Sequence, residues 1–163
     1  MNTRFVKYFK AILFAGMAAC MFTSCLKSGL EDLPSFDESK ITDVKFEFRY
    51  KDVNDLWIDG EPIVKFVNLT VQNKVINAET GNISCTVRVP AASGAFTETI
   101  RGQVSLTSIV GKFNISTAAV IEPVEGSPTL GIPGDFSAPR KYRVTAANGT
   151  SQVWTIHITG MDK

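Results

Sequence analysis

The segment RKYRVTAANGTSQVWTIHIT, residues 140–159, decides the fold, because it holds two alternating strands and the turn between them. On both sides of Asn148-Gly149 every second side chain is apolar; these positions are Tyr142, Val144, Trp154, Ile156 and Ile158. A period of two is typical of a strand with one buried face. Asn-Gly is the dipeptide most typical of tight hairpin turns. The segment therefore predicts an antiparallel hairpin whose apolar side chains enter the core.

Two turn lengths are compatible with this hairpin, and they place the side chains differently. A two-residue turn pairs Tyr142 with Thr155, so the two apolar sets lie on opposite faces of the hairpin. A three-residue loop at Ala147–Gly149, with its glycine left-handed, pairs Tyr142 with Trp154 and puts both sets on one face. Because a slip of one residue moves a whole strand's core side chains to solvent, we predict the three-residue loop.

The same alternation recurs in the preceding chain. Residues 41–50 alternate between apolar and charged side chains, and 63–72 and 83–89 are rich in β-branched residues. We expect residues 97–109 to hold one or two further strands, with Gly102 at a bend. Beyond the N-terminal apolar run, no segment has the helical period of about 3.6 residues. Short strands at this spacing predict an all-β domain, an immunoglobulin-like antiparallel β-sandwich of about seven or eight strands.

The chain begins with a secretory signal pattern in residues 1–24. Three cations, at Arg4, Lys7 and Lys10, precede an apolar run from Ala11 to Ser24 that contains no acid. A basic start followed by a short apolar segment is typical of signal peptides. The run is shorter than the roughly 20 residues that a transmembrane helix needs. We therefore predict a signal peptide, with an N-terminal signal helix, in residues 1–24.

The signal pattern ends at a cysteine. Ser24-Cys25 resembles a bacterial lipobox, in which a small residue precedes a cysteine that is acylated before cleavage, although Phe22 and Thr23 differ from its commonest form. Cys20 is a second candidate, but it would leave a shorter apolar run. The resemblance implies that Cys25 is the lipidation site. Two or more acyl chains would then anchor the protein stably to a membrane.

Composition divides the rest of the chain into a tether and one domain. Residues 25–39 mix glycine, proline, serine and acidic side chains without a period, which predicts a flexible tether after the lipidated N-terminus. Residues 40–163 have the usual size of one domain, here the β-sandwich. Without residues 1–24 the chain keeps 14 of its 17 Lys and Arg against 16 Asp and Glu, a formal charge of −2. This balance argues against nucleic acid as a partner.

Residues that carry catalytic or metal chemistry are rare in the sequence. His157, the only histidine, falls on the strand face opposite Trp154, which predicts a solvent-exposed side chain. Cys85 shares a face with apolar neighbours, so we expect a buried core residue rather than a reactive thiol. The sequence contains no nucleophile elbow, phosphate-binding loop or dinucleotide-binding motif. We therefore expect no catalysis, no cofactor and no metal.

The acidic segment between the first two expected strands is the candidate ligand site. Asp55 and Asp59 flank Trp57 there. An exposed indole can stack on a sugar ring while nearby carboxylates bind hydroxyl groups, so these three residues form a candidate glycan site. Because tryptophan is buried on average, we favour the alternative in which Trp57 covers the open end of the sandwich. Calcium is a further alternative, but the spacing of the acids does not match an EF-hand, and a solvated loop explains them.

The end of the chain carries a motif of aromatic and turn residues, namely Asp135-Phe136-Ser137, Pro139, Tyr142, Val144-Thr145-Ala146, Asn148-Gly149-Thr150 and Trp154-Thr155-Ile156. This motif resembles the closing motif of immunoglobulin- or cadherin-like domains in Bacteroidetes cell-surface lipoproteins. Ser24-Cys25 and the acidic spacer that follows are similar to the N-termini of those proteins. Most members have no known function, and some of their relatives belong to outer-membrane glycan-capture systems. The resemblance implies structural roles for the motif and carries over no binding residue.

These patterns predict a lipid-anchored domain that is exported to the bacterial outer membrane and acts as a non-enzymatic binding or adhesion module, with glycans as one ligand class. The alternative is a structural accessory subunit of an outer-membrane complex, which binds another envelope protein through an exposed strand edge. The expected partners are the membrane, through the N-terminal lipid, and a glycan or an envelope protein. An exposed Trp57 in a polar concavity would favour the glycan, whereas an apolar patch or an open strand edge would favour the protein.

Overall fold

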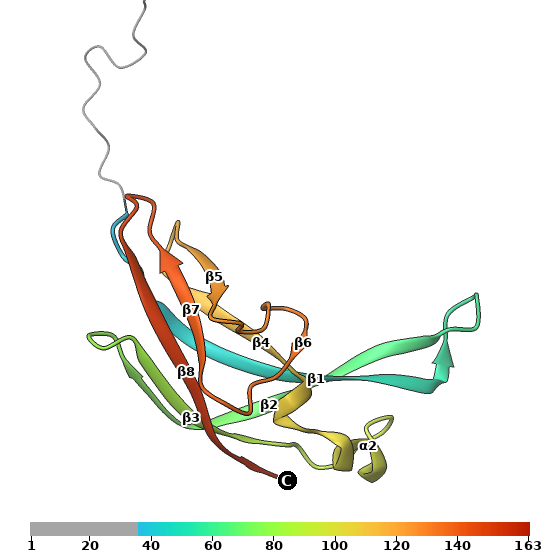
Figure 1. Ribbon diagram of the computed structural model, residues 1–163. Helices are drawn as coiled ribbons and strands as arrows, with labels where there is room; N and C mark the ends of the chain where they lie inside the picture. The colour runs from blue at the N-terminus through green and yellow to red at the C-terminus, as the bar shows by residue number, and fades with distance from the viewer. Residues whose placement is uncertain (1–35) are drawn as a thin grey trace, which may run out of the picture. The chain divides into compact units, whose positions relative to one another are not determined.

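The computed structural model describes residues 36–163 (Figure 1). The predicted signal peptide, Cys25 and most of the predicted tether lie outside the described residues. The elements, in chain order, are β1 (Ile41–Leu56), β2 (Pro62–Asn77), β3 (Asn82–Arg88), α2 (Glu98–Gln103), η2 (Leu106–Ser108), β4 (Ile109–Ile115), β5 (Val120–Val124), β6 (Pro133–Gly134), β7 (Arg140–Thr145) and β8 (Ser151–Asp162). No helix within residues 36–163 has the length and apolar character needed to cross a membrane.

All eight strands of the described part belong to one sheet, in the order β5-β7-β8-β3-β2-β1-β4-β6. The sheet curls on itself (Figure 1), and its two ends meet through aromatic side chains. The rings of Phe113 in β4 and Tyr142 in β7 lie 5.1 Å apart between centroids and meet edge to face. Phe46 in β1 and Phe136, just after β6, form a second edge-to-face pair at 5.4 Å. The first pair joins opposite ends of the sheet, and the second packs within its β1-β4-β6 end.

The strand count of the sequence prediction is confirmed, but the expectation of a purely antiparallel arrangement is wrong. β3 pairs with β8 in parallel, with Ile83 opposite Ile156 and Cys85 opposite Ile158, so the sheet is mixed. Alternation of apolar and polar side chains is the same in parallel and antiparallel strands, and it therefore cannot reveal their relative direction. A long connection joins β3 to β8, so no tight turn imposes an antiparallel pairing on them.

The predicted register of the β7–β8 hairpin is confirmed. Tyr142 pairs with Trp154, as the three-residue loop requires. Ala146 donates its backbone N–H to the carbonyl of Thr150 at 2.8 Å, which closes the loop at Ala147–Gly149. Gly149 has a φ of +89°, the left-handed conformation that glycine adopts without a steric penalty. Both apolar sets consequently share the buried face.

Cys85 lies in the core, as the alternation of β3 predicts. Its side chain is 1% exposed. Burial raises the pKa of the Cys85 thiol to about 11, although nearby Lys74 acts in the opposite direction. The thiol is therefore protonated and shielded at neutral pH, which agrees with a structural role. His157 is exposed on the opposite face of β8, also as predicted.

The expectation of one or two strands within residues 97–109 is wrong, apart from the first residue of β4. This segment contains the short helix α2 and the turn η2, and strand β4 begins only at Ile109. Thr97 caps α2, because its side chain accepts a hydrogen bond from the backbone N–H of Ile100 at 3.3 Å. Glu98 in the first turn and Arg101 in the last turn have the charges that favour each end of a helix. A helix of six residues is too short to show a helical period in the sequence.

The first described residues lie against the β7–β8 hairpin. Asn148 donates its backbone N–H to the carbonyl of Phe36 at 3.2 Å. Trp154 donates its Nε1–H to the carbonyl of Ser39 at 2.9 Å. The last four residues of the segment assigned to the tether, 36–39, are thus held by the domain. Trp154 joins this segment to the core, because its ring is fully buried.

Candidate functional site

The longest strands of the sheet extend beyond it as a two-stranded ribbon. β1 pairs with β4 only as far as Glu47, and β2 pairs with β3 only from Thr70. Between these points β1 and β2 pair with each other, from Phe48 opposite Val67 to Leu56 opposite Pro62. We call residues 48–69 the arm. Figure 1 shows the arm projecting from the rest of the sheet.

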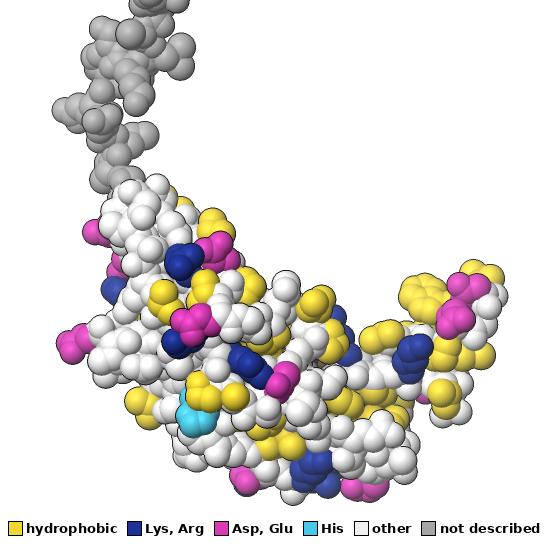
Figure 2. Space-filling view, viewed as in Figure 1, with side chains coloured by type: hydrophobic (Ala, Val, Ile, Leu, Met, Phe, Trp, Pro, Cys, Tyr) yellow, Lys and Arg dark blue, Asp and Glu magenta, His cyan; other side chains and the backbone are white. Residues whose placement is uncertain are grey.

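The end of the arm exposes three consecutive apolar side chains. Leu56 and Trp57 are 53% and 62% exposed, and Ile58 is fully exposed. A tight turn holds them: Gly60 donates its N–H to the carbonyl of Trp57 at 2.8 Å, and Trp57 donates its N–H to the carbonyl of Glu61 at 2.9 Å. Gly60 permits this turn because its φ is +85°. Figure 2 shows apolar and acidic side chains together at the end of the arm.

The favoured interpretation of Trp57, as a cover over the open end of the fold, is wrong. Its side chain is 62% exposed at the tip of the arm rather than packed against the core. The average burial of tryptophan misled this prediction, since tryptophan is also enriched where proteins bind partners. The indole is therefore available to a ligand.

The structure brings Asp55 and Asp59 to the same end of the arm but gives them different surroundings. Asp55 forms an ion pair with Lys65 at 2.8 Å, and Lys65 also binds Asp52 at 2.8 Å. The hydrogen bond from Lys65 lowers the pKa of Asp52, whose side chain is almost fully buried. Asp59 accepts the backbone N–H of Glu61 at 3.1 Å and so stabilises the turn. Asp59 keeps its second carboxylate oxygen for a ligand.

One face of the arm adds further exposed apolar surface. Val53, Val64 and Phe66 are each more than half exposed. At the base of this face the Lys112 ammonium lies 5.3 Å from the centre of the Phe66 ring. Large apolar side chains gathered on one exposed element mark an interaction site more often than apolar side chains scattered singly. Sequence reasoning missed this surface because the apolar character of residues 63–67 predicts burial on both faces.

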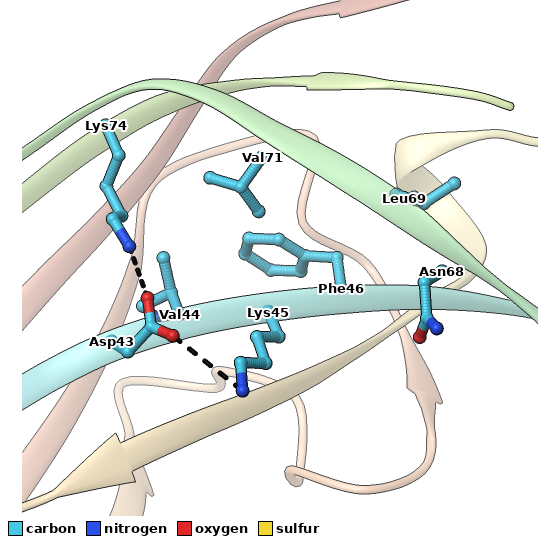
Figure 3. Close-up of a pocket in the computed structure, with 8 residues that line it drawn as sticks. All are labelled: Asp43, Val44, Lys45, Phe46, Asn68, Leu69, Val71 and Lys74. Carbon is cyan, nitrogen blue, oxygen red and sulfur yellow. Dashed lines mark hydrogen bonds and ion pairs between the residues drawn. The ribbon is translucent and has the colours of Figure 1, made fainter.

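A cavity of about 330 Å³ lies where β1 and β2 separate, near the base of the arm. Figure 3 shows Asp43 between Lys74 and Lys45, with Phe46 and Val71 to one side of them. The hydrogen bond from Lys74 lowers the pKa of Asp43. Asp43 balances one of the two lysines, so the lining of the cavity keeps one positive charge.

A second cavity, of about 400 Å³, lies beside the β2–β3 turn. Polar side chains from the turn and His157 line much of it. Neither cavity includes a residue from the arm's tip. Within residues 36–163, no group of three or more His, Cys, Asp or Glu side chains is arranged to hold a metal ion.

Comparison with known proteins places this geometry in a family. No curated protein matches the chain. A crystal structure of a "putative secreted protein" from Bacteroides fragilis NCTC 9343 is similar, with 38% sequence identity and a TM-score of 0.71. The similarity covers 80% of this chain and 100% of the Bacteroides chain, and it supports export of this protein. The family model described as DUF5018-related matches residues 41–157, from the first strand into the last, so the chain belongs to the DUF5018-related family.

Proposed function

We propose that this protein is an exported, lipid-anchored binding or adhesion module of the cell envelope, without catalysis, and that the arm is its binding element. The observation that carries the proposal is the exposed Leu56-Trp57-Ile58 tip on a projecting ribbon. Exposing three large apolar side chains in succession is unfavourable in water, and the contact with a ligand removes that cost. The similarity to the "putative secreted protein" of Bacteroides supports the export part of the proposal.

The anchoring part of the proposal rests on Cys25 and the lipobox resemblance. A Cys25→Ala variant should lose incorporation of labelled palmitate and leave the membrane fraction. Cys20→Ala is the matched control and should keep both properties. Continued membrane association of the Cys25→Ala variant would contradict the anchor.

The fold part of the proposal is an immunoglobulin-like sandwich. The two ends of the curled sheet pack through the edge-to-face pair of Phe113 with Tyr142. Side chains from two facing layers pack in this way in sandwich cores. A closed sandwich of this kind would leave the arm as its main projecting element.

A glycan is one ligand that the tip could take. Trp57 offers an aromatic face, and Asp59 offers a carboxylate oxygen beside it. A glycan array would test this, with wild type compared with Trp57→Ala and Trp57→Phe. We expect binding to be lost in the alanine variant and partly kept in the phenylalanine variant, because a smaller ring still stacks. Val120→Ala, an exposed apolar change on β5 away from the arm, is the control. If wild type gives no signal on the array, the tip does not bind a glycan.

The second candidate function is a structural accessory subunit that binds an envelope protein. The observation that favours it is the amount of apolar surface on the arm, since Val53, Val64 and Phe66 are exposed in addition to the tip. Protein interfaces typically use several adjacent apolar and aromatic side chains with a polar rim. The arm has this composition, with acids at its tip and Lys51 and Lys65 along its length.

A further inference from the structure

The outer edge of β2 in the arm is an unpaired strand edge. Residues 62–69 of β2 pair with β1 on one side, whereas β3 joins β2 only from Thr70 onward. Among the described residues, no other strand pairs with this part of β2. Its outward N–H and C=O groups are therefore available to another strand. An open edge of this kind is the template on which an added strand forms.

The two edges of the arm are not equally open. On β1 the register shifts between Asp52 and Leu56, so the residues between them bulge out of the ladder. A bulge is one of the devices that protect a strand edge from unwanted pairing. On β2 the register from Ile63 to Leu69 has no shift, and its first residue, Pro62, is the only proline. The regular edge of β2 therefore lacks the protection that the β1 edge has.

The side chains along the β2 edge fit an apolar partner strand. Val64 and Phe66 point to the exposed face and are 57% and 56% exposed. A strand added beside β2 would place every second side chain next to this pair. The usual gatekeeper of an edge strand is a free lysine. The one lysine here, Lys65, is already held by Asp52 and Asp55.

The charge at the tip indicates which charge the partner's side chains carry. Asp59 and Glu61 precede the β2 edge, and they take part in none of the ion pairs within residues 36–163. These uncompensated carboxylates favour basic groups on the partner. They also oppose insertion of the tip into a lipid bilayer, where carboxylates are costly to bury.

We propose that the β2 edge at Ile63–Asn68 pairs with an extended strand of a partner protein whose side chains are apolar toward Val64 and Phe66 and basic toward Asp59 and Glu61. The proposal rests on the second candidate function and specifies its contact. Backbone hydrogen bonds along the edge supply affinity, and the alternate side chains supply specificity. The exposed Leu56-Trp57-Ile58 tip packs against the surface from which that strand comes.

The test uses a synthetic peptide of about nine residues, the length of a strand, in which valine and threonine alternate and a lysine stands at each end. The valines match Val64 and Phe66, and one of the terminal lysines lies toward Asp59 and Glu61. The peptide is added to the full-length chain in detergent micelles, and amide hydrogen exchange is followed residue by residue. We expect exchange at alternate residues of Ile63–Asn68 to slow by about tenfold at saturating peptide. The same peptide with glutamate in place of the terminal lysines should protect these amides less. The lysine-ended peptide with alternate backbone amides methylated should not protect them, because it cannot form the ladder.

Two variants locate the contact. Val64→Lys with Phe66→Lys places free lysines on the open edge and should abolish the protection. Val75→Lys is the matched control, because Val75 is 60% exposed on the same strand but lies where β3 covers the edge, and it should keep the protection. Unchanged exchange in wild type, equal protection by the methylated peptide, or protection confined to β1 would each overturn the proposal.

Other occupants give different results. Sedimentation velocity without peptide shows whether the chain self-associates. If it does, and hydrogen exchange shows that self-association protects the same amides, the partner is a second copy of this chain and the proposal is overturned. A Cys25→Ala chain, which lacks the predicted lipid, can be tested for binding to phosphatidylcholine vesicles. If it binds and the further change Trp57→Ala abolishes binding, the arm binds a membrane rather than a protein, and the proposal is overturned. If glycan binding requires Trp57 and the peptide protects no amides, this inference is overturned, but the arm is still a binding element.

Discussion

Tyr142 lies directly opposite Trp154 across the β7–β8 ladder, and neither side chain has measurable exposure to solvent. Each ring also reaches a backbone carbonyl: Tyr142 donates its hydroxyl hydrogen to Pro128 at 2.8 Å, and Trp154 donates its indole N–H to Ser39 at 2.9 Å. This one pair therefore connects the core, the segment before β6 and the entry of the chain into the domain. Its position depends on the length of the loop at Ala147–Gly149.

Deletion of Val153 should destabilise the whole domain. With the loop at Ala147–Gly149 kept, Trp154 then pairs with Arg143 and Thr155 with Tyr142, so β8 must present its apolar side chains to water. We expect a loss of at least about 3–5 kcal/mol in the free energy of unfolding, comparable with the truncation of a buried tryptophan. Urea unfolding followed by Trp fluorescence measures it. Val153→Thr keeps the strand length and should unfold like wild type; equal stability of the deletion variant would contradict the register argument.

Glu47 should contribute stability that depends on pH. Its side chain is 2% exposed and pairs with Arg49 at 2.8 Å and with Lys112. Burial acts to raise the pKa of Glu47, but the hydrogen bonds from Lys112 and Arg49 outweigh it and lower the pKa below its usual value. Between the usual value of about 4.3 and the lowered value, the unfolded chain binds more protons than the folded one, so stability falls as pH falls.

A Glu47→Gln variant tests this dependence. At pH 7 we expect it to lose about 1–3 kcal/mol, because the partly exposed Lys112 and Arg49 regain some hydration. The difference from wild type should shrink as pH is lowered through the depressed pKa of Glu47. Glu122→Gln, which removes the exposed pair with Arg143, should cost less than about 1 kcal/mol. A difference from wild type that does not vary with pH would show that the Glu47 charge has no such role.

Lys65 should hold the arm closed near its tip. It is the cation shared by Asp52 and Asp55, and Asp52 is 5% exposed. Lys65→Gln leaves the Asp52 carboxylate buried without a cation, so we expect amides of residues 52–64 to exchange faster by about tenfold. Lys51→Gln, on the other face of the arm, is the control and should leave the exchange unchanged. The rest of the sheet should keep its protection in both variants, and uniform loosening of the domain would argue against a local role.

Cys85 should be unreactive until the domain unfolds. Burial shields the thiol and raises its pKa to about 11, so little thiolate forms at pH 8. In a chain that carries Cys20→Ser and Cys25→Ser, we expect no reaction with Ellman's reagent in the native state and complete reaction in urea. The rate of labelling in dilute urea should follow global unfolding. Rapid labelling of the native protein would place Cys85 in a mobile or exposed strand instead.

The β7–β8 hairpin could be predicted from sequence because alternation decides between its two possible turns. The need to bury Tyr142 and Trp154 on one face selects the three-residue loop over the two-residue Asn148-Gly149 turn, and the structure has that register. The parallel pairing of β3 with β8 could not be predicted, because alternation contains no information on strand direction. The helix α2 was missed because its signals, the Thr97 cap and the acidic Glu98, are confined to a single turn and a half.

The sequence grouped the residues of the candidate site, but it did not reveal the arm that carries them. The sequence indicated Asp55, Trp57 and Asp59 as one group, and the structure places all three at the end of the arm. The arm itself was missed, because Asp52 to Leu56 look like a loop in sequence yet extend strand β1. Exposure of Trp57 depends on how far β1 and β2 continue past their neighbours, and this is a tertiary property that no local pattern encodes.

The position of β8 between β7 and β3 has a consequence for export. β3 is synthesised about 60 residues before β8 yet has β8 as one of its two neighbours, so the sheet stays divided until residues 151–162 emerge. A chain that crosses a membrane from its N-terminus would therefore stay loose behind the translocation pore and complete its ladder only on the far side. Late closure of this kind would keep the two halves of the sheet apart during transport.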